Sequence, residues 1–265
     1  MKNIKKLVIV VSLAFLPIAS YAAELMPDFS LVPAGWNMDR YDPASFSNVG
    51  TFQGRNNVLG ISIDTTGDLA NRPAGFQTTF YNTQGRQHGV SGGAGSIISA
   101  DLFVPSTWAD ARNGYVRTDM WGVTSGPGGP DYPIIGFSNF GTGARFRVWD
   151  SDLNGGLGDW VNLATPISYN SWNALSINFT GSSYVYSVNG STVFTDTQTH
   201  GDGFNAVIME AYNFADPSLG SPTPTTVPYT AYWANKSVPD AGATWALMSM
   251  GLIAVAGLRS RFGLK

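Results

Sequence analysis

One stretch, residues 171–196, constrains the fold of this chain more than any other. Large apolar or aromatic side chains recur at every second position along two runs in it: Leu175, Ile177 and Phe179, and then Tyr184, Tyr186 and Val188. A period of two places alternate side chains on one face of a β-strand. Asn189 and Gly190 follow, and both tolerate the positive φ that a two-residue type I′ turn requires. The stretch therefore predicts three antiparallel strands joined by two turns.

The second turn also predicts which side chains meet across the hairpin. With a two-residue loop, Tyr186 is expected opposite Val193, and Val185 opposite Phe194. Each face of the hairpin would then pair an aromatic ring with a β-branched side chain.

Short alternating runs recur between Glu24 and Ser237, separated by Gly, Pro, Asn or Asp, and no long amphipathic helix pattern interrupts them. This spacing predicts an all-β fold, an antiparallel β-sandwich of two packed sheets. The chain has 265 residues and is 43% hydrophobic, which is enough for one sizeable core. We therefore expect a single β-sandwich domain over residues 23–237.

The composition excludes several classes of function. Charged residues make up 12% of the chain, about half the usual share, and the net charge is −3 with Lys and Arg scattered singly. Such a surface offers no basic face for phosphates, so nucleic acid is not an expected partner. The chain has no cysteine, which excludes disulfides, thiolate metal sites and a cysteine nucleophile.

The N-terminal segment, residues 1–22, has the three parts of a secretory signal peptide. Lys2, Lys5 and Lys6 precede an apolar run over residues 7–16, and small residues stand before a cleavage point after Ala22. The alternative, a retained membrane anchor, is disfavoured because the apolar run is short. The pattern predicts an exported protein that engages the secretion machinery.

The C-terminal segment, residues 238–265, is also tripartite. A Val-Pro-Asp-Ala-Gly motif over residues 238–242 precedes an apolar run over residues 243–258 and a basic tail over residues 259–265. The 16-residue apolar run is slightly shorter than the roughly 20 residues of a typical membrane span. It lacks the polar face of a packed surface helix, so it predicts a single transmembrane helix with a cytoplasmic C-terminus.

This ending resembles the PEP-CTERM class of sorting signals, in the variant that opens with Val-Pro-Asp-x-Gly. Val238, Pro239, Asp240 and Gly242 match that motif, whereas Ala241 stands where the family often has serine. The resemblance implies an inner-membrane intermediate in a Gram-negative-type bacterium, where an exosortase-like enzyme recognises the motif. The protein would then pass to the cell surface or extracellular matrix, and the helix would serve as a handle for sorting.

The body of the chain is similar to laminin G-like and concanavalin A-like jelly rolls over roughly residues 100–237. The similarity is carried by a W-x-x-L-x-I strand starting at Trp172, by the Y-x-Y-x-V-N-G hairpin starting at Tyr184, and by a closing strand near Tyr229. It implies a jelly-roll sandwich in which the last strand returns to pair near the first.

Few residues suit acid–base catalysis. Glycoside cleavage needs two carboxylates held about 5 to 10 Å apart. The chain has two glutamates, Glu24 and Glu210, and the E-x-D-x-E strand motif of jelly-roll glucanases is absent. Glu210 could pair with Asp119, although a carboxylate on a solvated strand face or bonded to Arg117 is the simpler reading. No catalytic residue is therefore assigned, but Glu210 buried in a cleft opposite a second carboxylate would favour an enzyme.

One loop has the composition of a calcium site. Asp150, Asp152 and Asn154 occupy positions 1, 3 and 5 of a calcium-loop pattern, Gly155 occupies position 6, and Asp159 could supply a late carboxylate. The bidentate glutamate of position 12 is replaced by valine. The alternative is a hairpin loop in which these residues serve turn formation.

Sugars bind proteins partly by stacking on aromatic rings. Trp108, Trp121, Trp149 and Trp160 are the candidate ligand-binding residues, and the alternative is that they fill the sandwich core.

The leading interpretation from the sequence is a non-enzymatic, exported surface or extracellular-matrix protein that binds exopolysaccharide through a lectin-like β-sandwich. Two alternatives stay open: an extracellular glycanase or polysaccharide lyase, and a purely structural coat protein. Calcium is the one cofactor that the sequence suggests.

Overall fold

The computed structural model describes residues 22–64, 74–76, 82–197, 201–214 and 227–236. The predicted signal peptide, apart from Ala22, and the predicted sorting helix lie outside these described residues. Among the helices in the described ranges, none combines the length and the hydrophobicity needed to cross a bilayer.

Eight strands of the described chain form one sheet, called sheet A, with the order β13-β12-β11-β6-β15-β4-β3, and β1 pairs with β6. Its strands are β1 (Ala23–Glu24), β3 (Ser45–Asn48), β4 (Leu59–Ile63), β6 (Ser96–Val104), β11 (Ser171–Phe179), β12 (Tyr184–Val188), β13 (Ser191–Asp196) and β15 (Tyr229–Asn235). The last strand, β15, lies inside the sheet between β6 and β4, as the jelly-roll resemblance implies.

Seven strands form the second sheet, called sheet B, with the order β10-β9-β8-β7-β14-β5-β2. Its strands are β2 (Asn37–Met38), β5 (Thr83–Gly92), β7 (Arg117–Thr124), β8 (Ile134–Ser138), β9 (Arg145–Asp150), β10 (Asp159–Asn162) and β14 (Phe204–Tyr212). All of its pairings are antiparallel.

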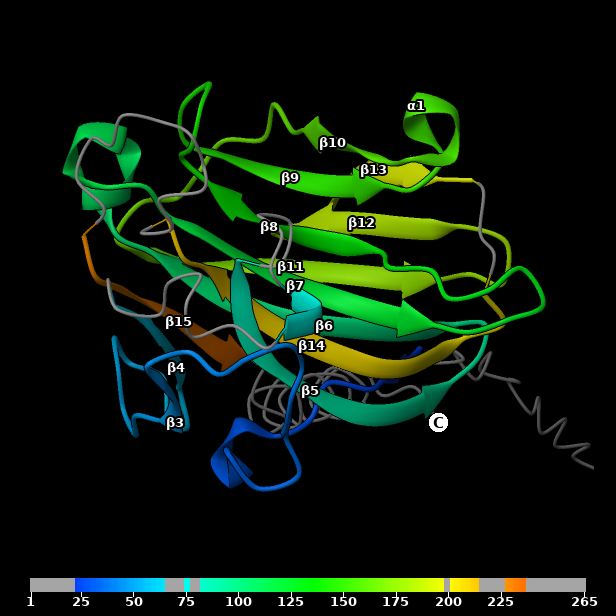
Figure 1. Cartoon of the computed structure of the whole chain (residues 1–265), viewed down its shortest axis with the longest axis horizontal. Coiled ribbons are helices and arrows are strands. Elements are labelled where there is room, and N and C mark those ends of the chain that lie inside the picture. The colour runs from blue at the N-terminus through cyan, green and yellow to red at the C-terminus, as the bar shows by residue number, and fades with distance from the viewer. Residues whose placement is uncertain (1–21, 65–73, 77–81, 198–200, 215–226, 237–265) are drawn as a thin grey trace, which may run out of the picture.

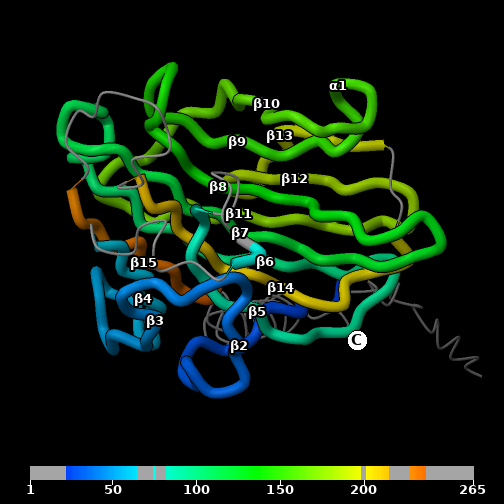
Figure 2. Tube along the Cα trace, viewed as in Figure 1, coloured from blue at the N-terminus to red at the C-terminus, as the bar shows by residue number. Residues whose placement is uncertain are grey.

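The two sheets stack face to face with their strands running in similar directions (Figures 1 and 2). Their inner faces form one continuous core, in which Met120 and Phe146 of sheet B meet residues such as Ile98 and Leu175 of sheet A. The helical segments are short: η1 (Phe29–Leu31), η3 (Ala74–Phe76), η5 (Ser106–Ala109), η6 (Ala111–Asn113) and α1 (Leu153–Gly156). The predicted all-β antiparallel sandwich is confirmed.

The hairpin β12–β13 has the predicted turn but not the predicted register. Asn189 and Gly190 have φ values of 51° and 79°, as a type I′ turn requires. Tyr186 pairs with Phe194 rather than with Val193, and Val185 pairs with Thr195. The cause is a β-bulge, which inserts Val193 as an extra residue in the edge strand β13 and shifts the pairs beyond it.

Candidate active site on the outer face of sheet B

Side chains on the outer face of sheet B are aligned in rows, because directly paired residues of neighbouring strands point to the same side. Along β7, Met120 points into the core, whereas the side chains of Asp119 and Trp121 are directed outward. Three rows follow from the strand register. The aromatic row contains Ile208, Trp121, Ile134, Trp149 and Trp160. The carboxylate row contains Gly85, Glu210, Asp119, Gly136, Arg147 and Asn162. The arginine row contains Arg117, Ser138 and Arg145.

The carboxylate row places two acidic residues side by side on neighbouring strands. Glu210 of β14 pairs directly with Asp119 of β7, and the two residues are 0% and 1% exposed. Glycines flank the pair on both sides. A side chain at Gly85 would collide with Glu210, and one at Gly136 would collide with the Asp119 carboxylate. The two glycines therefore leave the room that the carboxylates occupy.

Glu210 sits in an environment that disfavours its charged form. Burial raises the pKa of Glu210 to about 8, and the neighbouring carboxylate of Asp39 acts in the same direction against the opposing charge of Arg40. The Arg40 guanidinium donates to Glu210 Oε1 and also lies 2.9 Å from Asp39 Oδ2. Burial therefore favours the protonated form of Glu210.

Asp119 has different surroundings. Arg117 Nε donates to Asp119 Oδ2 at 2.6 Å, and Arg147 Nη2 lies 3.6 Å from the same oxygen. The two carboxyl groups of the pair are thus distinguished by their partners, with arginines on both sides of Asp119 and a second carboxylate beside Glu210.

The aromatic row adjoins this pair. Trp149 and Trp160 are partly exposed, and their rings meet edge to face with centroids 5.2 Å apart. Trp121 is buried, and the Arg40 guanidinium lies 4.8 Å from its ring centroid. A single side chain, Arg40, therefore covers both Trp121 and Glu210.

Trp108 is the exception among the four tryptophans predicted to bind ligand. It lies on η5 and belongs to the core between the sheets, where its ring packs 5.4 Å from Phe137. Its assignment as a ligand-binding residue was wrong, because a 3₁₀ turn at the end of β6 points the indole inward. The other three, Trp121, Trp149 and Trp160, share the aromatic row.

The simpler reading of Glu210 was also wrong. Its side chain is not on a solvated face, and its basic hydrogen-bond partner is Arg40, whereas Arg117 bonds to Asp119. Sequence reasoning missed Asp39 and Arg40 because they precede β3 and reach Glu210 only in the folded chain. It also missed Arg145 and Arg147, although a strand with arginines at alternate positions on a buried sheet was a usable signal.

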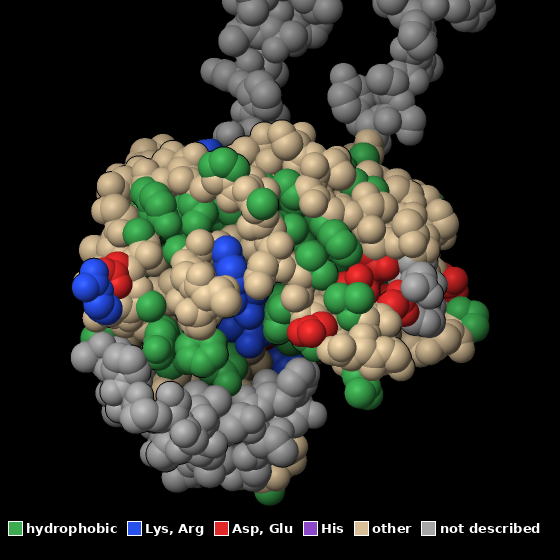
Figure 3. Space-filling model, turned by 90° about the horizontal axis from the view of Figure 1, so that it is seen from above, with side chains coloured by type: hydrophobic (Ala, Val, Ile, Leu, Met, Phe, Trp, Pro, Cys, Tyr) green, Lys and Arg blue, Asp and Glu red, His purple; other side chains and the backbone are tan. Residues whose placement is uncertain are grey.

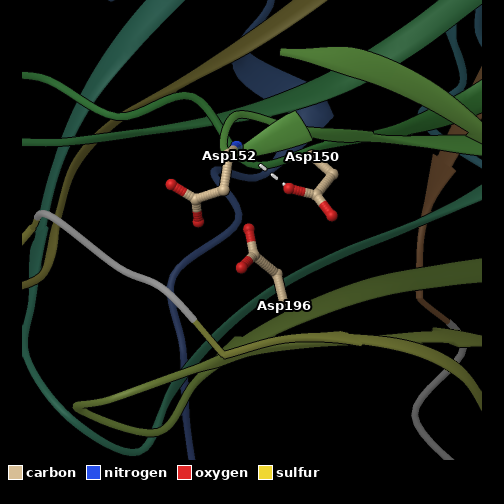
Figure 4. Close-up of side chains that lie close together, drawn as sticks. All are labelled: Asp150, Asp152 and Asp196. Atoms are coloured by element: carbon tan, nitrogen blue, oxygen red, sulfur yellow. Dashed lines mark hydrogen bonds between the residues drawn. The ribbon is translucent and has the colours of Figure 1, made fainter. Parts of the chain in front are cut away.

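Only part of the predicted calcium loop comes together. The carboxylates of Asp150 and Asp152 lie with that of Asp196 within 4.8 Å of one another and point toward a common centre (Figure 4). Asn154 and Asp159 instead bond to each other at 3.1 Å. Asp196 was missed because it ends β13 in sheet A, whereas the loop follows β9 in sheet B. Calcium binding stays a prediction, with a changed set of carboxylates.

Comparison with known proteins identifies the C-terminal segment. Residues 237–262 match the VPDSG-CTERM motif, a PEP-CTERM-like sorting signal. No curated protein matches the chain.

Several solved structures resemble the sandwich at low identity. A family 16 endo-glucanase from Bacteroides ovatus is 13% identical, with a TM-score of 0.49, covering 78% of this chain and 96% of its own. The Bacillus licheniformis β-glucanase is 16% identical, with a TM-score of 0.43 and coverage of 77% and 94%. A β-1,3-1,4-glucanase (lichenase) from a mouse hindgut metagenome is 14% identical, with a TM-score of 0.43 and coverage of 78% and 94%.

These findings correct the leading functional interpretation. The expected non-enzymatic, lectin-like module is corrected here: the three solved structures named above are glucanases, the class that the sequence had left as an alternative. Glu210 is buried and pairs with a second acidic residue, Asp119, which meets part of the condition set for that class. The chain is thus an exported, cell-envelope-targeted protein in which a PEP-CTERM-like sorting signal follows a jelly-roll β-sandwich.

Proposed function

We propose that this protein is an extracellular glycanase whose reaction takes place at the Glu210–Asp119 pair. The observation that carries the proposal is that two buried acidic residues, Glu210 and Asp119, are paired on neighbouring strands beside a row of aromatic rings. Glycosidases use such a pair, one group as an acid and the other as a nucleophile or base. Carboxyl groups with contrasting environments are the usual way to divide those roles.

Glu210 is the proton donor in this proposal. Its carboxyl proton passes to the glycosidic oxygen as the bond to the anomeric carbon breaks, which leaves Glu210 as a carboxylate beside Arg40. Asp119 is the second carboxylate, which attacks the anomeric carbon or activates a water for that attack. Arg117 and Arg147 hold Asp119 in place for this step.

The aromatic row supplies a surface for the sugar. Rows two residues apart along a strand are separated by roughly 7 Å, about the width of one pyranose ring. A sugar stacked near Trp149 and Trp160 would therefore present its linkage toward the carboxylate row.

Substrate reaches Glu210 only when Arg40 moves aside. Arg40 lies in the segment between β2 and β3, outside the strands of sheet B, and its one side chain covers both Glu210 and Trp121. Displacement of that side chain opens the acid and an aromatic ring together.

The sorting signal supports a place of action outside the cytoplasm. In the proposal, the secretion machinery exports the chain, and an exosortase-like enzyme of a Gram-negative-type bacterium processes the motif at residues 238–242. Polysaccharide at the cell surface or in the extracellular matrix is then the substrate.

The test is release of reducing ends from a panel of polysaccharides by the full-length protein, purified in mild detergent. Glu210→Gln and Asp119→Asn are each expected to lower the rate by about 10²-fold or more. Asp110→Asn is the matched control, because Asp110 is a surface carboxylate paired with Arg112. The proposal fails if no polysaccharide is cleaved, or if the two variants match the control.

A further inference from the structure

Three arginines gather at one end of the carboxylate and arginine rows. Arg147 and Arg145 lie on β9, two residues apart on the same face, and Arg117 lies on β7. Figure 3 shows basic side chains between patches of hydrophobic side chains on the face that it presents. We call these three residues the arginine cluster.

Arg147 is the most buried member of the cluster and is incompletely satisfied. It is 7% exposed, and within the described part of the chain its Nε and Nη2 atoms have no hydrogen-bond partner. A buried guanidinium normally has its donors bonded, because an unmet charged donor costs free energy. Its Nε and Nη2 atoms are therefore buried donors without a hydrogen-bond partner, and Nη2 lies 3.6 Å from Asp119.

Charge in the cluster is unbalanced. Asp119 lies 3.6 Å from Arg147 Nη2, but it already accepts a hydrogen bond from Arg117 at 2.6 Å. Burial, followed by the nearby charge of Arg117, lowers the pKa of Arg147 to about 9. The arginines thus repel one another, and an additional negative charge among them would relieve that repulsion.

An aromatic ring adjoins the same guanidinium groups. The Trp160 ring centroid lies 3.6 Å from the Arg147 guanidinium and 4.8 Å from that of Arg117. Trp160 is partly exposed at the β10 edge of sheet B. Trp160 therefore lies beside Arg147 and Arg117. An aromatic ring can stack on a sugar, and guanidinium groups can bind an anion.

We infer that the arginine cluster is a subsite for an acidic sugar residue, so that the substrate is an anionic polysaccharide rather than a neutral glucan. The inference rests on the proposed glycanase function and specifies its substrate class. A carboxylate of a uronic acid and a sulfate ester both present the oxygens that guanidinium groups bind. The sugar ring would lie against Trp160 with its charged substituent directed toward Arg147.

Binding of defined oligosaccharides to the full-length Glu210→Gln protein tests this inference without turnover. Titration calorimetry would compare oligogalacturonate, a sulfated heparin-derived oligosaccharide and a neutral gluco-oligosaccharide of equal length. We expect at least one acidic ligand to bind 10-fold or more tightly than the neutral one at 0.15 M salt, and the two acidic arms separate carboxylate from sulfate recognition.

Substitutions locate the site. Arg147→Gln is expected to weaken acidic-ligand binding at least 10-fold, whereas Arg112→Gln, at a highly exposed arginine outside the cluster, should leave it unchanged. If Arg147→Gln does not fold, as judged by circular dichroism, Arg145→Gln provides a second test at a partly exposed position, where Nε and Nη1 also donate to Asn162, Phe140 and Gly143.

The outcomes separate the inference from the function on which it rests. Equal or tighter binding of the neutral ligand, or binding that both arginine substitutions leave intact, overturns the inference even if polysaccharide is cleaved. If the wild-type protein binds acidic ligands tightly but cleaves none of them, the proposed catalysis is contradicted and the acidic subsite is still supported.

Discussion

Glu210 illustrates how burial alters the pKa of a single carboxyl group. Its pKa of about 8 lies above its ordinary value of 4.5, so the folded protein keeps a proton that the unfolded chain loses between these pH values. The folded state therefore binds more protons than the unfolded state in this window, and stability falls as pH rises through it. For one group the slope is at most about 1.4 kcal/mol per pH unit. The same proton is the one that catalysis would use.

Glu210→Gln should flatten this pH dependence, because the amide is neutral at every pH. Between pH 5 and about pH 8, the free energy of unfolding of the wild type should decline more steeply than that of the variant, as measured by urea denaturation. Asp110→Asn, at an exposed carboxylate, serves as the control and should follow the wild type. Parallel declines for wild type and Glu210→Gln would show that Glu210 does not titrate in this range.

At the scale of the strands, register decides what the residues can do together. Each row depends on pairings across several strands, and a slip by one residue would turn its side chains from the outer face to the core. Glycines are part of this arrangement, since Gly85 and Gly136 occupy row positions where the neighbouring carboxylates need space. The candidate site is thus a property of four paired strands, β5, β14, β7 and β8.

Gly136→Ala tests that arrangement. The added methyl group would collide with the Asp119 carboxylate and with the backbone oxygen of Thr118, so we expect a loss of about 1–3 kcal/mol in the free energy of unfolding. Gly89→Ala is the matched control, because Gly89 is a strand glycine of the same sheet where an added Cβ would meet no atom within 4 Å. Chemical denaturation of both variants measures the difference, and equal stabilities would contradict the packing described for Asp119.

At the scale of the whole molecule, the two sheets also bring charged side chains together at one end. Asp150 ends β9 in sheet B, Asp152 follows it, and Asp196 ends β13 in sheet A (Figure 4). Three carboxylates so close together repel one another, and a divalent cation would offset that repulsion while linking the sheets.

Calcium at millimolar concentration is therefore expected to raise the melting temperature, and a chelator to reverse the effect. Asp196→Asn should abolish most of the response, whereas Asp202→Asn, at an exposed aspartate of another loop, should retain it. Differential scanning calorimetry with and without calcium makes the comparison. An unchanged melting temperature in the wild type would rule out a stabilising ion at this cluster.

The sequence by itself determined the features that are encoded locally. Alternation along 171–196, the Asn189–Gly190 turn and the order of parts in residues 238–265 are each read from neighbouring residues, and the strands, the turn and the sorting motif agree with them. Local pattern suffices there because side-chain direction and turn dihedrals depend on short stretches of backbone.

Only the tertiary structure decided which distant residues meet. Trp108 and Trp149 look alike in the sequence, yet one fills the core and the other lies on the outer face of sheet B. Glu210 meets Asp119, and Asp196 meets Asp150, through strand order and through the stacking of two sheets. The physical reason is that burial, and with it the pKa and the charge balance of a side chain, is set by neighbours from other strands rather than by its own segment.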